Sequence, residues 1–150
     1  VGFQYGAGDK QKLRNIYHTS FLFVAVSSVF MAVIAIVLSP TIVTIFTDDP
    51  ATYELAAVGF RQFAINFLFS GISITSSGFF TALSNGTISA VISFCRTLGF
   101  IVLSLLILPK FLGITGAWIA IPVAEFCTLL VTGVMHFVYF WKSGIRNYLR

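Results

Sequence analysis

The sequence contains few charged residues and few cysteines, and each shortage excludes a class of protein. Nine Lys and Arg and five Asp and Glu make up only 9% of the 150 residues, whereas about 25% is typical of soluble domains. So few charges cannot cover the surface of a soluble globule. The two cysteines, Cys95 and Cys127, both lie inside apolar runs, which excludes a disulfide scaffold. The two cysteines and two isolated histidines also lack the spacing of a metal site.

Apolar residues, in contrast, are abundant. Hydrophobic residues make up 57% of the chain, including 17 Phe, and the mean hydropathy is +0.95. Intrinsic disorder is excluded, because a chain this apolar must bury its side chains. We therefore expect an all-α integral membrane protein whose solvent is the lipid bilayer.

Four apolar runs have the length of a membrane-spanning helix. They are residues 20–38, 54–83, 88–108 and 117–141. The first reaches roughly 28 Å as a helix, close to the ~30 Å hydrocarbon core. The second and third form one uncharged stretch that is too long for a single crossing, and the turn-forming residues 84–87 divide it. Pro109 closes the third run, and Pro40 is expected to break or kink the helix after the first.

The distribution of charge predicts the orientation of these spans. Basic residues lie outside the first and last runs, at Lys10, Lys12, Arg14, Lys142, Arg146 and Arg150. The loop after the first run is acidic, with Asp48, Asp49 and Glu54. Because basic flanks stay inside the cell, we expect both ends of this segment on the cytoplasmic side of the cell membrane. No stretch interleaves basic residues with exposed aromatic rings, which argues against nucleic-acid binding.

The N-terminal boundary of the first span also carries a local signal. Asp9 precedes the basic residues and is placed to cap the helix that contains them. The chain begins with Val1-Gly2-Phe3 and no initiator Met, which reads as the end of a preceding span. We therefore expect this segment to be part of a longer protein.

A polar stripe is the main feature of the second span. Its members recur at intervals of three or four residues: Gln62, Asn66, Ser70, Ser73 and Ser77. This helical period places them on one face, which must meet other helices or water because lipid cannot satisfy their hydrogen bonds. Two interpretations remain open. The stripe packs helices together, or it lines the pathway of a transported solute.

Two charged residues lie inside the third and fourth spans. Arg96 and Glu125 come to within about 5 Å of the same depth when both are counted from the ends of their helices. Consecutive antiparallel helices are usually neighbours, so we predict an intramembrane Arg96–Glu125 pair. The alternative is that Arg96 extends to the cytoplasmic interface while Glu125 is protonated. If Glu125 titrates, it is a candidate for the coupling carboxylate of a transporter.

Two further residues of the fourth span have both a structural and a functional interpretation. Pro122 is expected to kink the helix, either as a hinge or simply for packing. His136 lies near the cytoplasmic interface and is either an interfacial histidine or a proton relay. Ser73 and His136 could form a catalytic dyad only if their depths agreed, which they do not. We therefore expect no enzyme activity.

Several motifs, in order along the chain, resemble the C-terminal lobe of multidrug and toxic compound extrusion (MATE) transporters. Residues 2–9, followed by a basic helix, resemble the segment after the second helix of that lobe. Residues 40–48 look like the family's outer turn, "P…LFT.D", and Arg61 with residues 78–86 follows its "R…G…A.G" course. The "R…LP..FG..G.W.A.P..E" signature is similar to Arg96, Leu108, Pro109, Phe111, Gly113, Gly116, Trp118, Pro122 and Glu125.

The resemblance implies a twelve-helix antiporter with two six-helix lobes. This chain would supply the end of helix eight and helices nine to twelve, and would pack against the N-terminal lobe of the same protein. Such transporters exchange cationic, amphipathic drugs for protons or sodium by alternating access. We expect a monomer that needs no cofactor besides the coupling ion, H+ or Na+, and that is nearest to the bacterial drug-efflux branch.

The resemblance also bears on the polar stripe, which would face the central cavity. Some branches of the family keep an acidic residue on this helix, whereas this sequence has Ser70 near that place. Two alternatives to drug efflux remain open. One is a lipid-linked sugar flippase of the same superfamily, which would need a more cationic cavity, and the other is a truncated membrane protein without transport activity.

Overall fold

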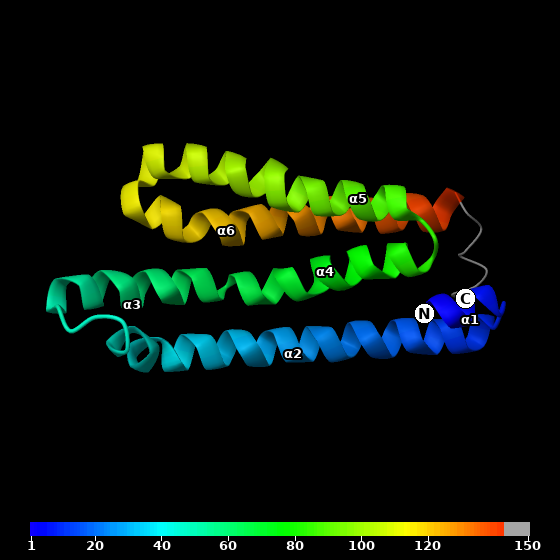
Figure 1. The fold of residues 1–150 in the computed structure, drawn as a ribbon, viewed down its shortest axis with the longest axis horizontal. Helices are drawn as coiled ribbons and strands as arrows, with labels where there is room; N and C mark the ends of the chain where they lie inside the picture. Colours follow the sequence, from blue (N-terminus) through cyan, green and yellow to red (C-terminus); the bar gives the residue numbers. More distant parts are fainter. Residues whose placement is uncertain (143–150) are drawn as a thin grey trace.

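The computed structural model describes residues 1–142, and these residues are almost entirely helical (Figure 1). Arg146 and Arg150, which entered the prediction of orientation, lie outside the described residues. The elements are α1 (Gly2–Gly6), α2 (Lys10–Thr44), α3 (Pro50–Ala64), α4 (Asn66–Ala82), α5 (Gly86–Phe94), the π-helix η1 (Cys95–Phe100) and α6 (Ile101–Lys142).

Three helical stretches are long and apolar enough to cross a membrane: Gln11–Thr44, Pro50–Ala82 and Gly86–Tyr139. The third has 54 residues and would be about 80 Å long if straight, far beyond the ~30 Å bilayer core. It reverses direction at Gly113, whose φ of 58° and ψ of −138° are not helical. The chain therefore runs four times along the long axis of the molecule (Figure 1), as a fold with four spans requires.

Helix α4 occupies the middle of the arrangement. It packs against α2 on one side and against α5 and α6 on the other (Figure 1). Many of the side chains buried between the helices are small, as is usual where membrane helices approach closely, and Phe80, Leu13 and Ile92 are the largest that are fully buried. The small ones include Ala32, Ala35, Ala57, Ala64, Ala120 and Ala124. Large apolar side chains such as Phe23, Phe30 and Val37 point outward. This pattern suits a protein whose outer surface contacts lipid.

Local hydrogen bonds explain where the helices begin. The Asp9 carboxylate accepts a hydrogen bond from the backbone N–H of Lys12 at 3.0 Å, which confirms the predicted cap of α2. Asn85 caps α5 in the same way through Ile88. Ser84 has a φ of 60°, and residues 83–85 separate α4 from α5; Gly86 and Thr87 of the predicted 84–87 turn already belong to α5.

Proline residues interrupt the helices less than their sequence positions suggest. Pro40 does not end α2, which continues to Thr44. Proline removes one backbone donor and leaves a carbonyl one turn earlier without its usual bond, but neighbouring helices and local adjustments make this tolerable in membranes. The buried Ser39 hydroxyl, next to Pro40, donates to the carbonyl of Ala57 at 3.0 Å and joins α2 to α3 here.

The predicted second span is divided into two helices. Helix α3 ends at Ala64 and α4 begins at Asn66, with Ile65 between them. The N–H of Ile65 bonds to the carbonyl of Gln62, three residues back rather than four, so the helix tightens locally. This irregularity falls inside the polar stripe.

The cap of α3 leads to a prediction about pH. The hydroxyl of Thr52 (2.6 Å) and its backbone N–H (2.8 Å) both donate to Asp49, and these bonds hold the pKa of Asp49 below its usual value of 3.8. A carboxyl with a lowered pKa stabilises the fold above its unfolded-state pKa, and this contribution is lost as the pH falls through the folded-state value. We expect Asp49→Ala to lower the thermal midpoint slightly at neutral pH. The difference from the wild type should shrink as the pH falls below 3.8. A difference that persists unchanged in acid would assign the effect to something other than the carboxylate.

Candidate functional site

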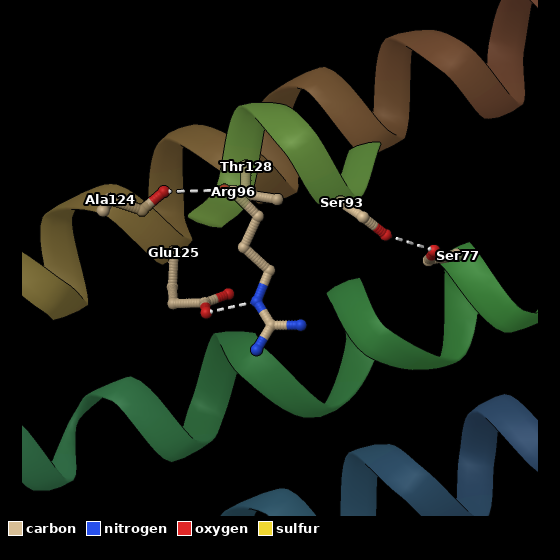
Figure 2. Close-up of polar contacts among 6 residues, drawn as sticks. All are labelled: Ser77, Ser93, Arg96, Ala124, Glu125 and Thr128. Carbon is tan, nitrogen blue, oxygen red and sulfur yellow. Dashed lines mark hydrogen bonds and ion pairs between the residues drawn. The ribbon is translucent and has the colours of Figure 1, made fainter. Parts of the chain in front are cut away.

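The centre of the candidate site is an ion pair between helices. Arg96 lies in η1 and Glu125 in the part of α6 that follows the reversal at Gly113. The Nε of Arg96 donates to Oε1 of Glu125 at 2.7 Å, and Figure 2 shows both side chains pointing towards α4. The Glu125 side chain is only 2% exposed, whereas Arg96 is 29% exposed. The structure thus brings together the two charges that the depth argument paired.

A π-helical turn positions Arg96. Within η1 the backbone N–H of Ile101 bonds to the carbonyl of Arg96, five residues back. Such a turn holds one more residue than an α-helical turn and changes the direction in which the following side chains point. Short π-helical segments occur frequently at functional sites. The sequence did not predict this turn, because the residues around Arg96, including Thr97 and Gly99, are equally compatible with an α-helix.

The polar stripe of the second span divides into two parts. Towards the end of α4, the hydroxyl of Ser77 contacts the hydroxyls of Ser89 at 2.9 Å and Ser93 at 3.0 Å, both on α5 (Figure 2 shows the second contact). Thr81, one turn further along, donates to Ser89 at 2.7 Å. This end of the stripe therefore joins α4 to α5, and the packing interpretation applies to Ser77.

The other members of the stripe are placed differently. Ser70 lines an open groove of about 370 Å³ between α2 and α4, together with Ser27 and Ser28. Within residues 1–142, the buried side-chain oxygens of Gln62, Asn66 and Ser73 have no hydrogen-bond partner. Buried polar atoms are costly unless they are satisfied. These three oxygens are therefore the part of the stripe whose hydrogen-bonding capacity is unused among the described residues.

Pro122 and Glu125 lie on adjacent turns of α6, and both are buried. The residue with non-helical dihedrals in α6 is Gly113, and the helix continues through Pro122. Proline at this position removes the hydrogen bond to the carbonyl of Trp118, one turn earlier. The role of Pro122 as a hinge stays a prediction.

The second oxygen of Glu125 is also part of the site. Oε2 is buried and has no hydrogen-bond partner in the described part of the chain. The carboxylate therefore keeps one coordinating position open while the other is occupied by Arg96. A carboxylate oxygen of this kind can bind a proton or, together with further oxygen ligands, a small hard cation. No group of three His, Cys, Asp or Glu side chains within residues 1–142 could hold a metal ion.

These features define an all-α multi-pass membrane protein with a charged pair buried between its spans. The MatE family model matches residues 1–106, which include the polar stripe and Arg96. The chain belongs to the MatE family, whose members are membrane transporters. Comparison with curated proteins and with solved structures gives no match.

Proposed function

We propose that this chain is the C-terminal part of a twelve-helix antiporter that exports cationic, amphipathic compounds across the cell membrane in exchange for protons or sodium. The observation that supports this most is the Arg96–Glu125 pair, whose carboxylate is buried and has one oxygen without a hydrogen-bond partner among the described residues. Ionisable residues inside a membrane are costly, and they commonly mark ion and substrate pathways. The stripe oxygens of Gln62, Asn66 and Ser73 supply polar contacts for the solute.

The transport of ion and solute is coupled because Arg96 and the ion compete for Glu125. While the carboxylate is charged, Arg96 balances it and holds η1 against α6. A proton or sodium ion that binds to Glu125 replaces this balance, so Arg96 loses its partner and the two helices can separate. Because a ligand shifts an equilibrium only by its differential affinity for the two states, ion and solute must each prefer a different arrangement. The N-terminal lobe of the same monomeric protein supplies the other wall of the cavity.

The neutral stripe favours a drug-like solute over a lipid-linked sugar. The head group of such a lipid is anionic and would need cationic side chains in the cavity. The three stripe residues with open oxygens are uncharged, and the nearby Arg96 is already paired with Glu125.

Accumulation of a fluorescent organic cation tests the proposal. Cells that lack their own efflux pumps would express the complete transporter, and accumulation would be measured with and without a proton uncoupler or a sodium gradient. We expect lower accumulation than in control cells, restored when one of the two gradients is removed. Unchanged accumulation, with the protein shown to be in the membrane, would favour a flippase or an unrelated solute.

Replacing two stripe residues should weaken export without affecting insertion. Asn66→Leu and Ser73→Ala each remove a buried oxygen that has no partner among the described residues. Alanine is chosen at Ser73 because that side chain is fully buried, with no space for leucine. Loss of one polar contact to a charged solute corresponds to about a tenfold loss of export. The control is Thr19→Leu, on the exposed surface of α2. Normal export by both variants at normal expression would reduce the stripe to a packing surface.

A further inference from the structure

A second polar line runs along α6 from Glu125 towards the end of the described chain. Thr128, Thr132 and His136 follow Glu125 at intervals of three, four and four residues, which places all four on one face. Glu125, Thr128 and Thr132 are at most 2% exposed, and His136 is half-buried. The line covers about 16 Å along the helix axis.

Helix α4 presents hydroxyl groups to the same line. The two helices run side by side in the same direction: the ring of Phe69 lies 5.6 Å from that of Phe126, and Ser76 lines the same cavity as Thr132. Ser73 and Ser76 are both completely buried. Thr128 lies on the same face, but its hydroxyl donates to the carbonyl of Ala124 at 2.9 Å within α6. The remaining groups, Ser73, Ser76, Thr132 and His136, form what we call the polar track.

The part of the track near His136 contains space for water. A cavity of about 270 Å³ lies between α2, α4 and α6, and Tyr17, Ser76, Thr132 and His136 are among the residues that line it. The hydroxyl oxygens of Ser73, Ser76 and Thr132 have no hydrogen-bond partner within the described residues. A cavity of this size accommodates several water molecules, and buried waters bind to polar groups that the protein leaves unsatisfied. Lipid cannot take that role.

Hydrogen bonding defines the histidine at the end of the track. Nδ1 of His136 lies 3.0 Å from the carbonyl oxygen of Thr132. Since a carbonyl can only accept, Nδ1 carries the hydrogen in the neutral ring and Nε2 carries the lone pair. Titratable side chains of this aromatic cluster also include Tyr17 and His18 of α2 and Tyr139 of α6.

We propose that the polar track conducts protons between Glu125 and the cytoplasmic end of the fold, so that the coupling ion is the proton. This inference rests on the proposed role of Glu125 as the coupling carboxylate. When Glu125 releases a proton, a water molecule bound at its Oε2 would take it, because this oxygen has no hydrogen-bond partner among the described residues. The hydroxyls of Ser73, Ser76 and Thr132, with the water in the cavity, then each pass one proton to the next group. Nε2 of His136 accepts the last proton and gives it to water at the interface. One proton leaves the carboxyl and one reaches the cytoplasm, and Arg96 again balances the Glu125 carboxylate.

The proposal predicts how quickly the protonated Glu125 carboxyl exchanges with solvent. Its carbonyl stretch is measured by infrared spectroscopy of the complete protein in lipid vesicles and is assigned by its absence in Glu125→Gln. After transfer to D2O, this band should shift rapidly in the wild type. Thr132→Val and Ser76→Ala interrupt the water chain, and each should slow the exchange by about tenfold or more, because a positioned proton-transfer group contributes a factor of at least about 100.

Two variants control for damage to the fold. Thr132→Ser keeps the hydroxyl and should exchange at the wild-type rate. Thr75→Val is the same type of change next to Ser76, but Thr75 does not line the cavity of the track, so it should leave the rate unchanged. Wild-type exchange in Thr132→Val and Ser76→Ala, or equal slowing in Thr75→Val, would overturn the track.

The same samples distinguish this inference from the proposed function. Fluorescent-cation export is measured in parallel with the exchange rate. Export that persists while Thr132→Val exchanges normally would overturn the track and leave the antiporter intact. Slowed exchange in a protein that exports nothing would support the track and overturn drug efflux.

Discussion

Removing one partner of the Arg96–Glu125 pair is expected to destabilise the protein by about 3 kcal/mol or more. Truncating one member of a buried pair leaves the other charge without compensation, at a cost of roughly 3–5 kcal/mol. This cost applies to Glu125 when Arg96 is removed, since the Glu125 side chain is only 2% exposed. Arg96→Met should therefore cost more than Glu125→Gln, because Arg96 is 29% exposed and retains access to its surroundings.

A double-mutant cycle measures the pair itself. The free energy of unfolding would be obtained by titrating the lipid-reconstituted protein with denaturing detergent and following its helical circular dichroism. We expect a coupling energy of about 2–3 kcal/mol between Arg96→Met and Glu125→Gln, near the upper end for residues in contact. Arg61→Met, at an exposed position on α3, is the control and should change stability by about 0.5 kcal/mol or less. Simple additivity of the two single changes would show that the contact contributes nothing.

The neutral double variant Arg96→Met/Glu125→Leu separates stability from function. Replacement of a whole buried pair by apolar residues is often neutral or stabilising. We therefore expect this variant to fold at least as well as either single variant while losing ion-coupled export. Such a result would mean that the pair serves ion-coupled transport rather than the stability of the fold.

The features that the sequence predicted well depend on neighbours in the chain or on depth in the membrane. Asp9 caps α2, and a turn lies at residues 83–85, at the start of the predicted 84–87 turn, because a few local residues determine both structures. The proximity of Arg96 to Glu125 followed from residue counts alone, since consecutive helices with a short connection lie together.

The features that the sequence did not predict depend on tertiary packing. The period of a stripe indicates which residues share a face of a helix, but not which neighbouring helix each residue contacts. Ser77 therefore bonds to α5, while Ser70 lines a groove against α2. The π-helix at Arg96 contains Thr97 and Gly99, and Asn66 follows the break at Ile65, but these residues also occur in regular helices and do not distinguish the two irregularities. The intervals between Glu125, Thr128, Thr132 and His136 were visible in the sequence. Threonines inside an apolar helix do not by themselves indicate a polar pathway, and the cavity that faces them is known only from the structure.

The reversal of α6 depends on two glycines, and Gly116→Ala is expected to damage it most. Gly116 is buried, and a methyl group there would overlap the backbone carbonyl of Leu108 and the nitrogen of Pro109. A flexible side chain could move away from such a contact, but these are backbone atoms of the preceding arm. Overpacking of this kind costs about 1–3 kcal/mol and occasionally more. We therefore expect Gly116→Ala to lower the free energy of unfolding by an amount near the upper end of this range.

The effect should extend to the ion pair, because Gly116 lies between the reversal at Gly113 and Glu125 on the same helix. If the arm that follows Gly116 shifts, Glu125 moves relative to Arg96. The coupling energy of the double-mutant cycle should then fall in the Gly116→Ala background. The control is Gly78→Ala on α4, where an added methyl group meets nothing within 4 Å. Since alanine favours a helix over glycine by about 1 kcal/mol, Gly78→Ala should leave stability unchanged or raise it slightly. If Gly116→Ala and Gly78→Ala were equally stable and the coupling energy were unchanged, the close approach at Gly116 would not be needed. The segments of α6 before and after the reversal would then bring the charges together without it.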